Sequence, residues 1–208
     1  MYKRQDDGNI LVADTNNKRI QKFTSNGQFM VAIGRDTVEL KYPVSINIHP
    51  DSKKIILSDH TNHCLQILNP DLTFHSSFSN KGQFYCPWSV AFDSAGNMYV
   101  GEKRSDNSAC IQVFTAEGQF LRKFGNTGSG KGELNFPSSI SINRDNVVYV
   151  TDYHNHRVSM FTTEGVFLRS FGTKGNGHGQ FNYTSGITMD KDGFIYISDS
   201  INGRIQIF

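Results

Sequence analysis

A short apolar run that ends in an acidic residue recurs five times along this chain of 208 residues. The copies read GNILVAD, KIILSD, NMYVGE, VVYVTD and FIYISD, and they end at Asp14, Asp59, Glu102, Asp152 and Asp199. Successive copies are 45, 43, 50 and 47 residues apart. Because the repeat length fixes the unit from which such a chain is built, this spacing constrains the fold more than any other feature.

Further positions keep the same register after each acidic residue. Three residues later, four copies carry an asparagine, namely Asn17, Asn62, Asn155 and Asn202. Five residues later, three copies carry an arginine, namely Arg19, Arg157 and Arg204. Cys64 takes the arginine position in the second copy, and Cys110 takes it in the third copy after three extra residues. The repeat is therefore a structural unit, and the exceptions at these two positions fall in its second and third copies.

Within each unit the hydrophobic period is two. The segments IQKF, IQVF and IQIF alternate, as do SVAFD, SISIN and GITMD, which is typical of β-strands. DSAGN and DKDGF carry the Asp and Gly residues of hairpin turns. Four short strands in about 45 residues indicate one blade of a β-propeller. We therefore expect an all-β fold made of four-stranded antiparallel blades.

The strand pattern predicts about five blades, of which the first and the last are incomplete. Residues 1–6 match no first strand elsewhere, so we expect the chain to open at the second strand of a blade and to stop at the third strand of another. We expect one domain, 1–208, with blades at about 1–40, 41–84, 85–134, 135–181 and 182–208. On this interpretation the chain is a piece of a longer ring, and its unpaired strand edges favour association.

The repeats resemble NHL repeats, whose pattern runs proline, apolar strand, turn, G-x-I-Y-V-x-D, N-x-R-I-Q-x-F and G-x-F-L-x-x-F-G. The resemblance covers essentially the whole chain. The competing WD repeat is disfavoured because its Gly-His and Trp-Asp marks are missing from the sequence. NHL propellers are best known at the C-terminus of TRIM (tripartite motif) proteins, where they recognise protein or RNA.

The resemblance implies a non-catalytic recognition module, namely the substrate-recognition part of a TRIM-type E3 ubiquitin ligase. A protein substrate or adaptor is the expected partner, with single-stranded or structured RNA as the second possibility. The chain lacks a zinc-binding Cys/His array, so we do not expect it to hold the ligase's catalytic part. The alternative is a metal-dependent propeller enzyme similar to amidating lyases or lactonases. We expect no catalytic residues, no metal ligands and no cofactor.

Composition distinguishes only weakly between a recognition module and an enzyme, and between protein and RNA partners. A net charge of +2 neither demands nor excludes a nucleic-acid partner. No run of 18 apolar residues is present, so no membrane partner is expected. Three widely spaced cysteines without a C-x-x-C pair fit reduced thiols, which favours a cytoplasmic location.

The recurring acidic and arginine positions are interpreted as structural. A carboxylate and an arginine five residues apart can form an ion pair that ties a hairpin, with the guanidinium stacked between blades. A thiol cannot replace that support, so the second and third copies are expected to be weaker. The structural set is Asp14, Arg19, Asp59, Asp152, Arg157, Asp199 and Arg204.

Two sets of loops share one side of a propeller: the turns after each acidic residue and the linkers between blades. Cations among aromatic residues in these loops suit a protein interface and suit RNA equally well. The histidines of YHNH are interpreted as surface variation rather than metal ligands, and GSGKGE (128–133) as a flexible linker. The partner-binding candidates are Lys18, His63, Trp88, Lys103, Arg104, Tyr153, His156 and Tyr183.

Overall fold

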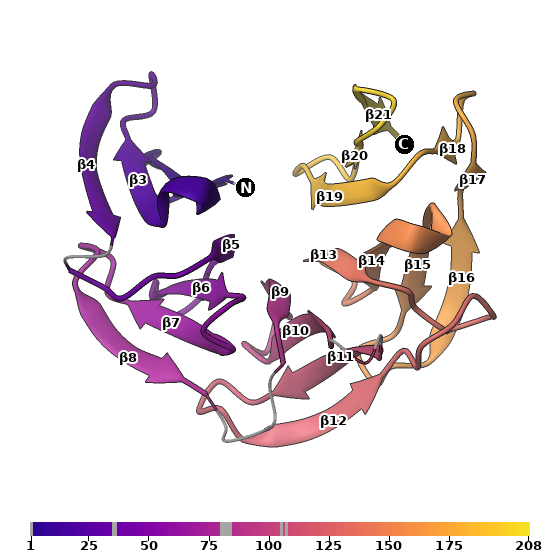
Figure 1. The fold of residues 1–208 in the computed structure, drawn as a ribbon, viewed down its shortest axis with the longest axis horizontal. Coiled ribbons are helices and arrows are strands. Elements are labelled where there is room, and N and C mark those ends of the chain that lie inside the picture. The colour runs from indigo at the N-terminus through magenta and orange to yellow at the C-terminus, as the bar shows by residue number, and fades with distance from the viewer. Residues whose placement is uncertain (1, 35–36, 80–84, 105, 107) are drawn as a thin grey trace. The chain divides into compact units, whose positions relative to one another are not determined.

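The computed structural model describes residues 2–34, 37–79, 85–104, 106 and 108–208, and they form an almost entirely β fold (Figure 1). Within these ranges the only helical segments are two 3-10 turns, η1 (Thr15–Asn17) and η2 (Tyr153–Asn155). No helix in the described part is long and apolar enough to cross a membrane. The chain divides into two compact units, Met1–Val90 and Ala91–Phe208.

The first unit contains two antiparallel sheets whose strands follow chain order. The first sheet consists of β1 (Tyr2–Arg4), β2 (Ile10–Asp14), β3 (Arg19–Phe23) and β4 (Phe29–Gly34). The second consists of β5 (Pro43–Ile48), β6 (Ile55–Asp59), β7 (Cys64–Leu68) and β8 (Phe74–Phe78).

Strand β1 corrects the sequence-based expectation that the first blade lacks a strand. Tyr2 lies opposite Val12 and Arg4 lies opposite Ile10, so β1 occupies the position that β5 has in the next sheet. The pairing uses backbone N–H and C=O groups, which any residue other than proline supplies. The segment YKR carries no alternating apolar pattern, and for this reason the sequence did not reveal it.

The second unit continues with β10 (Met98–Lys103), β11 (Ala109–Phe114) and β12 (Phe120–Phe124), in one sheet with β9 (Pro87–Phe92), the strand that spans the boundary between the units. The next sheet consists of β13 (Pro137–Ile142), β14 (Val148–Asp152), β15 (Arg157–Phe161) and β16 (Phe167–Phe171).

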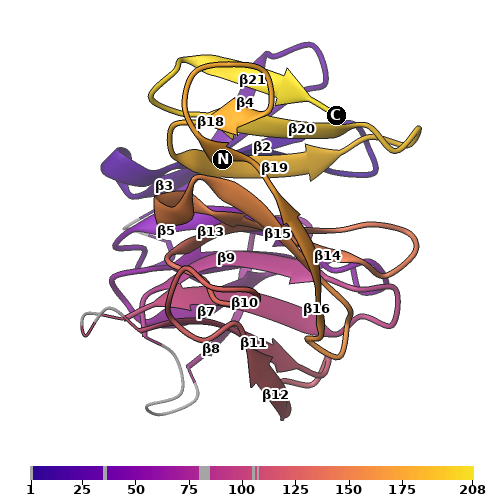
Figure 2. The same cartoon turned by 90° about the vertical axis from the view of Figure 1, so that its right-hand side faces the viewer.

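The last sheet has three strands within the described residues, as the sequence predicted. They are β19 (Thr184–Met189), β20 (Ile195–Asp199) and β21 (Arg204–Ile207), and they run side by side in Figure 2. A short parallel pair, β17 (Thr173–Lys174) and β18 (Gln180–Phe181), lies in the linker that precedes this sheet. This pair could not be predicted from the sequence, because the glycine-rich linker shows no apolar alternation.

Apolar side chains of consecutive sheets pack together in both units. In the first unit, Leu11 and Ile20 of one sheet share a core with Ile46 and Leu57 of the next. In the second unit, Val158 shares a core with residues of the following sheet. The repeats therefore bury one another's faces, which is how the blades of a propeller are stabilised.

Each described linker adds one buried apolar side chain to these cores. The three residues are Leu40, Leu134 and Phe181, with relative exposures of 2%, 0% and 0%. They occupy the same place in the repeat, in the segments ELKYP, ELNFP and QFNYT. The linkers are therefore anchored, and the loops of the candidate site are built on these anchors.

Candidate functional site

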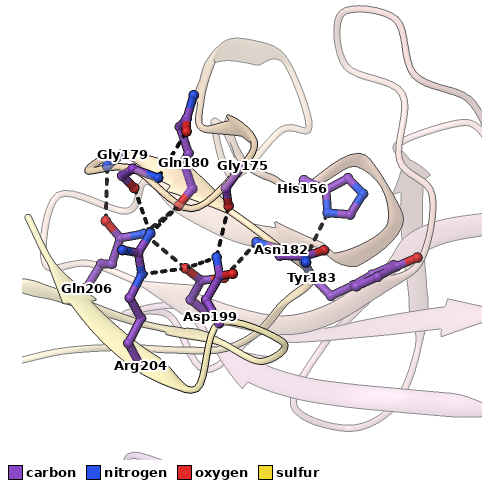
Figure 3. Close-up of polar contacts among 11 residues, drawn as sticks. His156, Gly175, Gly179, Gln180, Asn182, Tyr183, Asp199, Arg204 and Gln206 are labelled. Atoms are coloured by element: carbon purple, nitrogen blue, oxygen red, sulfur yellow. Dashed lines mark hydrogen bonds and ion pairs between the residues drawn. The ribbon is translucent and has the colours of Figure 1, made fainter.

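The carboxylate of Asp199 organises one repeat, as Figure 3 shows. It accepts hydrogen bonds from the backbone N–H of Asn182 at 2.6 Å, from Asn202 Nδ2 at 2.9 Å, from Arg204 Nε at 2.8 Å and from Gln206 Nε2 at 3.3 Å. Because Asp199 is fully buried, these donors supply the hydrogen bonds that its charge loses with water.

The same side chains fasten the linker that leads into this sheet. Arg204 Nη2 donates to Gln180 O at 3.0 Å (Figure 3). It also donates to Gly177 O at 2.6 Å. Gln206 Nε2 also donates to Gln180 O, at 2.6 Å, and Gln206 Oε1 accepts from Gly179 N at 3.0 Å. The arginine and the glutamine thus hold the linker by its backbone, independently of the linker's own side chains.

Asp152 forms the same cluster one repeat earlier. Its carboxylate accepts from the N–H of Asn135 at 2.6 Å, from Asn155 Nδ2 at 2.8 Å and from Arg157 Nε at 3.0 Å. The Arg157 guanidinium also donates to three carbonyl oxygens, those of Ser129, Gly130 and Glu133, at 2.9, 3.0 and 2.7 Å. The GSGKGE segment is therefore held in place by Arg157, whereas the sequence predicted a flexible linker.

The predicted ion pairs are confirmed, but the guanidinium has a different second role. The Arg19–Asp14, Arg157–Asp152 and Arg204–Asp199 pairs measure 2.7, 3.0 and 2.8 Å. In the second unit the remaining guanidinium nitrogens contact linker carbonyls, where we had expected stacking between blades. An arginine fork can donate to several carbonyl oxygens of a glycine-rich linker at once.

The two repeats without the arginine hold their carboxylates in other ways. Asp59 accepts from the backbone N–H groups of Lys41 and Tyr42, at 3.0 and 2.8 Å. Glu102 is 1% exposed and pairs with Arg104, whose Nε lies 3.4 Å from Glu102 Oε1. The extra residues of the third repeat thus supply a substitute arginine, so Arg104, a partner-binding candidate, faces its own repeat.

The pKa values of these carboxyl groups reflect a balance between burial, which raises them, and hydrogen bonds, which lower them. Burial acts to raise the pKa of Asp199, but the hydrogen bonds from Asn182, Asn202 and Arg204 outweigh it and the pKa is lowered. Burial dominates at Asp152 and raises its pKa despite similar donors. The two thiols at arginine positions are inert, because burial and a nearby carboxylate raise the pKa of Cys64 to about 11 and that of Cys110 to about 12.

Five rings gather where the linkers meet the turns in the second unit. Tyr153 lies 5.2 Å from Phe136 and 4.7 Å from Tyr183, measured between ring centroids. His154 lies 5.1 Å from Tyr153, and His156 lies 4.6 Å from Tyr183. We call these five residues the aromatic stack. Its centroid spacings leave no gap for an ammonium group, so the stack is a packed surface rather than a cage for a cationic ligand.

A cation and a backbone contact complete this surface. Lys103 Nζ donates to Asn135 Oδ1 at 3.0 Å and lies 5.9 Å from the centroid of the Phe136 ring. His156 Nδ1 accepts the backbone N–H of Tyr183 at 3.0 Å (Figure 3). The pKa of His156 is lowered, mainly by burial and next by the charge of Lys174, so its imidazole is neutral at pH 7. The stack therefore presents aromatic rings beside the ammonium group of Lys103.

The first unit holds the other candidates. Lys18 is exposed at a left-handed position directly after η1. His63 Nδ1 accepts the N–H of Cys86 at 3.1 Å, and the His63 ring lies 5.3 Å from that of Tyr85. Trp88 meets His60 edge to face at 4.9 Å. Of the eight candidates, the structure thus brings four together in the aromatic stack and its rim: Lys103, Tyr153, His156 and Tyr183.

Sequence reasoning overlooked the glutamines of the recurring IQ dipeptide. Gln21 donates to Asp14 at 3.0 Å and Gln112 donates to Glu102 at 3.0 Å, as Gln206 does to Asp199. The sequence does contain a signal for this structural role, because four of the five copies carry Gln at this position and only the fourth copy, with Ser159, departs. Period-two alternation identifies a strand here, but it does not indicate that the glutamine side chain reaches the carboxylate of its own repeat.

The residues that the structure describes include no group of three or more His, Cys, Asp or Glu side chains placed to hold a metal ion.

Comparison with known proteins identifies the repeat. The family model described as NHL repeat matches residues 6–23, 134–161 and 181–208. The Drosophila melanogaster protein brain tumor is 33% identical over 121 residues, which cover 56% of this chain and 11% of that protein. Peptidyl-glycine alpha-amidating monooxygenase A of Xenopus laevis is 26% identical over 170 residues, covering 73% of this chain and 17% of that protein. The chain thus spans less than a fifth of either curated relative.

Solved structures show the same fold at low identity. A chain of the nidogen/laminin complex matches with a TM-score of 0.78 and 16% identity, covering 98% of this chain and 72% of that one. Streptogramin B lyase matches with a TM-score of 0.71 and 16% identity, covering 100% of this chain and 67% of that one. At this identity the likeness concerns architecture alone.

Proposed function

Because this chain is an NHL-repeat β-propeller, we propose that it is a non-catalytic recognition module that binds a protein partner through the aromatic stack. The observation that carries the proposal is the convergence of Phe136, Tyr153, His154, His156 and Tyr183 on one surface, with Lys103 at its rim. Tyrosine and other aromatic residues are the usual anchors of protein interfaces.

The rigidity of the surface supports this proposal. Tyr153 donates its backbone N–H to Phe136 O at 3.0 Å, and the Asp152 cluster clamps the linker that carries Phe136. Side chains already ordered in the free protein lose little entropy on binding, which favours affinity. A net charge of +2 gives no strong electrostatic attraction to a phosphate backbone, so a protein is favoured over RNA.

We extend the proposal to the parent protein on the resemblance of the repeats to the C-terminal propellers of TRIM proteins. In that setting the aromatic stack presents a substrate or adaptor to a ubiquitin ligase whose catalytic part lies outside this segment. A cytoplasmic location belongs to the same proposal.

The test compares two single substitutions, Tyr153→Ala in the stack and Leu168→Ala on the outer strand β16, where Leu168 is 47% exposed. Proteins retained from an extract of the source cells would be quantified by mass spectrometry. We expect a set of proteins to be lost with Tyr153→Ala and kept with Leu168→Ala. Equal retention by both variants would refute the role of the stack.

RNA is tested by titrating the chain with random single-stranded RNA at low and at moderate salt. Binding that weakens steeply with salt, and that Tyr153→Ala abolishes, would replace the protein proposal with an RNA one. No binding at low salt is the result that the protein proposal requires.

A second candidate function is a metal-dependent propeller enzyme, and the similarity to the Xenopus amidating monooxygenase favours it. Its test is elemental analysis of the purified protein after dialysis. A stoichiometric zinc or calcium ion that resists dialysis would favour the enzyme and count against a purely non-catalytic module.

A further inference from the structure

His156 binds the backbone of the next repeat at a residue that lies in the left-handed region. Tyr183 has a φ of +63°, in the left-handed region, which is unfavourable for a side chain of this size. Its N–H is fixed by His156 Nδ1 at 3.0 Å, and its ring lies 4.6 Å from the His156 ring (Figure 3). The hydrogen bond and the ring contact together offset the backbone strain.

The first unit contains the same arrangement independently. Cys86 has a φ of +49°, and its N–H is held by His63 Nδ1 at 3.1 Å. His63 and His156 occupy the same position of the repeat, four residues after the acidic residue, with φ values of +52° and +54°. The same contact therefore occurs in both of the repeats that carry a histidine at this position.

The hydrogen bond fixes the protonation state of the imidazole. Nδ1 accepts a hydrogen bond from a backbone N–H, so it carries no proton of its own, and the ring proton of the neutral form lies on Nε2. A second proton would enter at Nδ1 and place two N–H groups against each other. The contact that holds Tyr183 would then become repulsive.

The charges around His156 come from three elements. Its own turn contributes His154 and Asp152, and Asp152 is paired with Arg157. Strand β17 contributes the cation Lys174, and strand β20 contributes Asp199, which is paired with Arg204. Burial and Lys174 lower the pKa of His156 against the opposing pull of the two carboxylates. The neutral ring is therefore the resting form at pH 7.

We propose that protonation of His156 releases Tyr183 from its left-handed conformation and disassembles the aromatic stack, so that recognition by this surface is gated by pH. The proposal rests on the function proposed above for the stack. The gate is closed in acid, because the acceptor at Nδ1 is lost there, and open at neutral pH.

The sign of the effect follows from linkage. The folded protein holds His156 with a pKa below the ordinary value of about 6.5. The stabilising contribution of the neutral ring is therefore complete above pH 6.5 or so, and it is lost as the pH falls through the folded pKa.

The test follows the amide of Tyr183 by hydrogen exchange and the ring nitrogens of His156 by NMR, at about pH 8 and about pH 5. His156→Asn is the informative variant, because Asn Oδ1 can accept the same hydrogen bond, Asn tolerates the left-handed region and its side chain does not titrate. His156→Gly removes the acceptor and is matched by the natural Gly203 at this position. His178→Asn, on the exposed part of the linker, is the control.

In the wild type we expect the Nε2–H tautomer at pH 8 and a five- to tenfold or so loss of Tyr183 protection at pH 5, after correction for intrinsic exchange. His156→Asn should keep protection at both pH values, His156→Gly should lack it at both, and His178→Asn should match the wild type. The amide of Asn182, bound to Asp199, serves as an internal reference.

Equal Tyr183 protection at both pH values in the wild type would overturn the proposal, and so would an acid-induced loss in His156→Asn. A proton on Nδ1 at pH 8 would overturn it as well. None of these measurements uses a partner, so the gate and the proposed function can fail separately: an intact gate with no protein bound to the stack would refute only the latter.

Discussion

Replacing Arg157 by cysteine tests the energetic role of the arginine clamp. The variant is one that the chain itself uses, since Cys64 and Cys110 occupy the same repeat position. Arg157 is 14% exposed on its side chain and its partner Asp152 is 0% exposed, so this is a buried ion pair. Removing the guanidinium also leaves three linker carbonyls without their donor.

The expected cost is large because a buried charge is stranded. Breaking a buried ion pair by deleting one partner typically costs about 3–5 kcal/mol, against a total stability of about 5–15 kcal/mol for a whole domain. Asp152 keeps two donors, the N–H of Asn135 and Asn155 Nδ2, which places the expected value near the lower end, about 3 kcal/mol. The pKa of Asp152, which burial already raises, should rise further.

Urea unfolding followed by circular dichroism measures this cost, with Arg169→Cys on the outer strand as the control. Arg169 is exposed, so the control should change the free energy of unfolding by no more than about 0.5 kcal/mol. The double variant with Asp152→Asn removes the stranded charge, and we expect it to recover about 2 kcal/mol relative to additivity. A cost for Arg157→Cys below about 1 kcal/mol, or additive single effects, would refute the clamp.

Three further predictions follow from named contacts. Gly172→Ala should lower the free energy of urea unfolding by about 2–4 kcal/mol, because a Cβ at this left-handed glycine would lie 2.6 Å from the Phe181 ring. Gly193→Ala should lower it by only about 1 kcal/mol, because a Cβ there would meet no described atom within 4 Å. Equal costs would show that packing plays no part. Ser159→Gln should raise the free energy of unfolding by about 0.5–1.5 kcal/mol, because Ser159 Oγ is buried with no hydrogen-bond partner among the described residues and Gln at this position reaches the carboxylate in other repeats. A destabilised variant would mean that the site cannot hold the longer side chain. Because the pKa of Asp199 is lowered, its carboxylate contributes stability that is complete above the unfolded pKa of about 3.9 and is lost as the pH falls through the folded pKa. Asp199→Asn should therefore flatten the acid side of a plot of urea midpoint against pH. An unchanged slope there would contradict this role of the Asp199 carboxylate.

Most of the fold could be predicted from the repeat in the sequence. Acidic, asparagine and arginine positions recur in register, and each maps to one hydrogen-bonded cluster, as at Asp199. What the sequence did not reveal depends on backbone geometry. Strand β1 pairs through its main chain, and the arginine clamp acts on linker carbonyls, so neither leaves a mark in side-chain periodicity.

The candidate surface could be predicted only as a set of loops. The sequence placed Tyr153, His156 and Tyr183 in neighbouring turns and linkers, but it could not show which side chains face one another. Arg104 illustrates the limit, because its pairing with Glu102 depends on how three extra residues fold back. The left-handed conformation of Tyr183 could not be predicted either, because a positive φ is unusual for tyrosine and its hydrogen bond to His156 is visible only in the structure.

Photo-crosslinking tests the central claim, that the aromatic stack recognises a protein, most directly. A photoreactive amino acid would replace His154, an exposed member of the stack, and in a parallel protein it would replace Leu168 on β16. After irradiation in an extract of the source cells, the account predicts discrete protein adducts from position 154 and few from position 168. Equal adducts from both positions, or adducts from position 154 that contain only RNA, would contradict it.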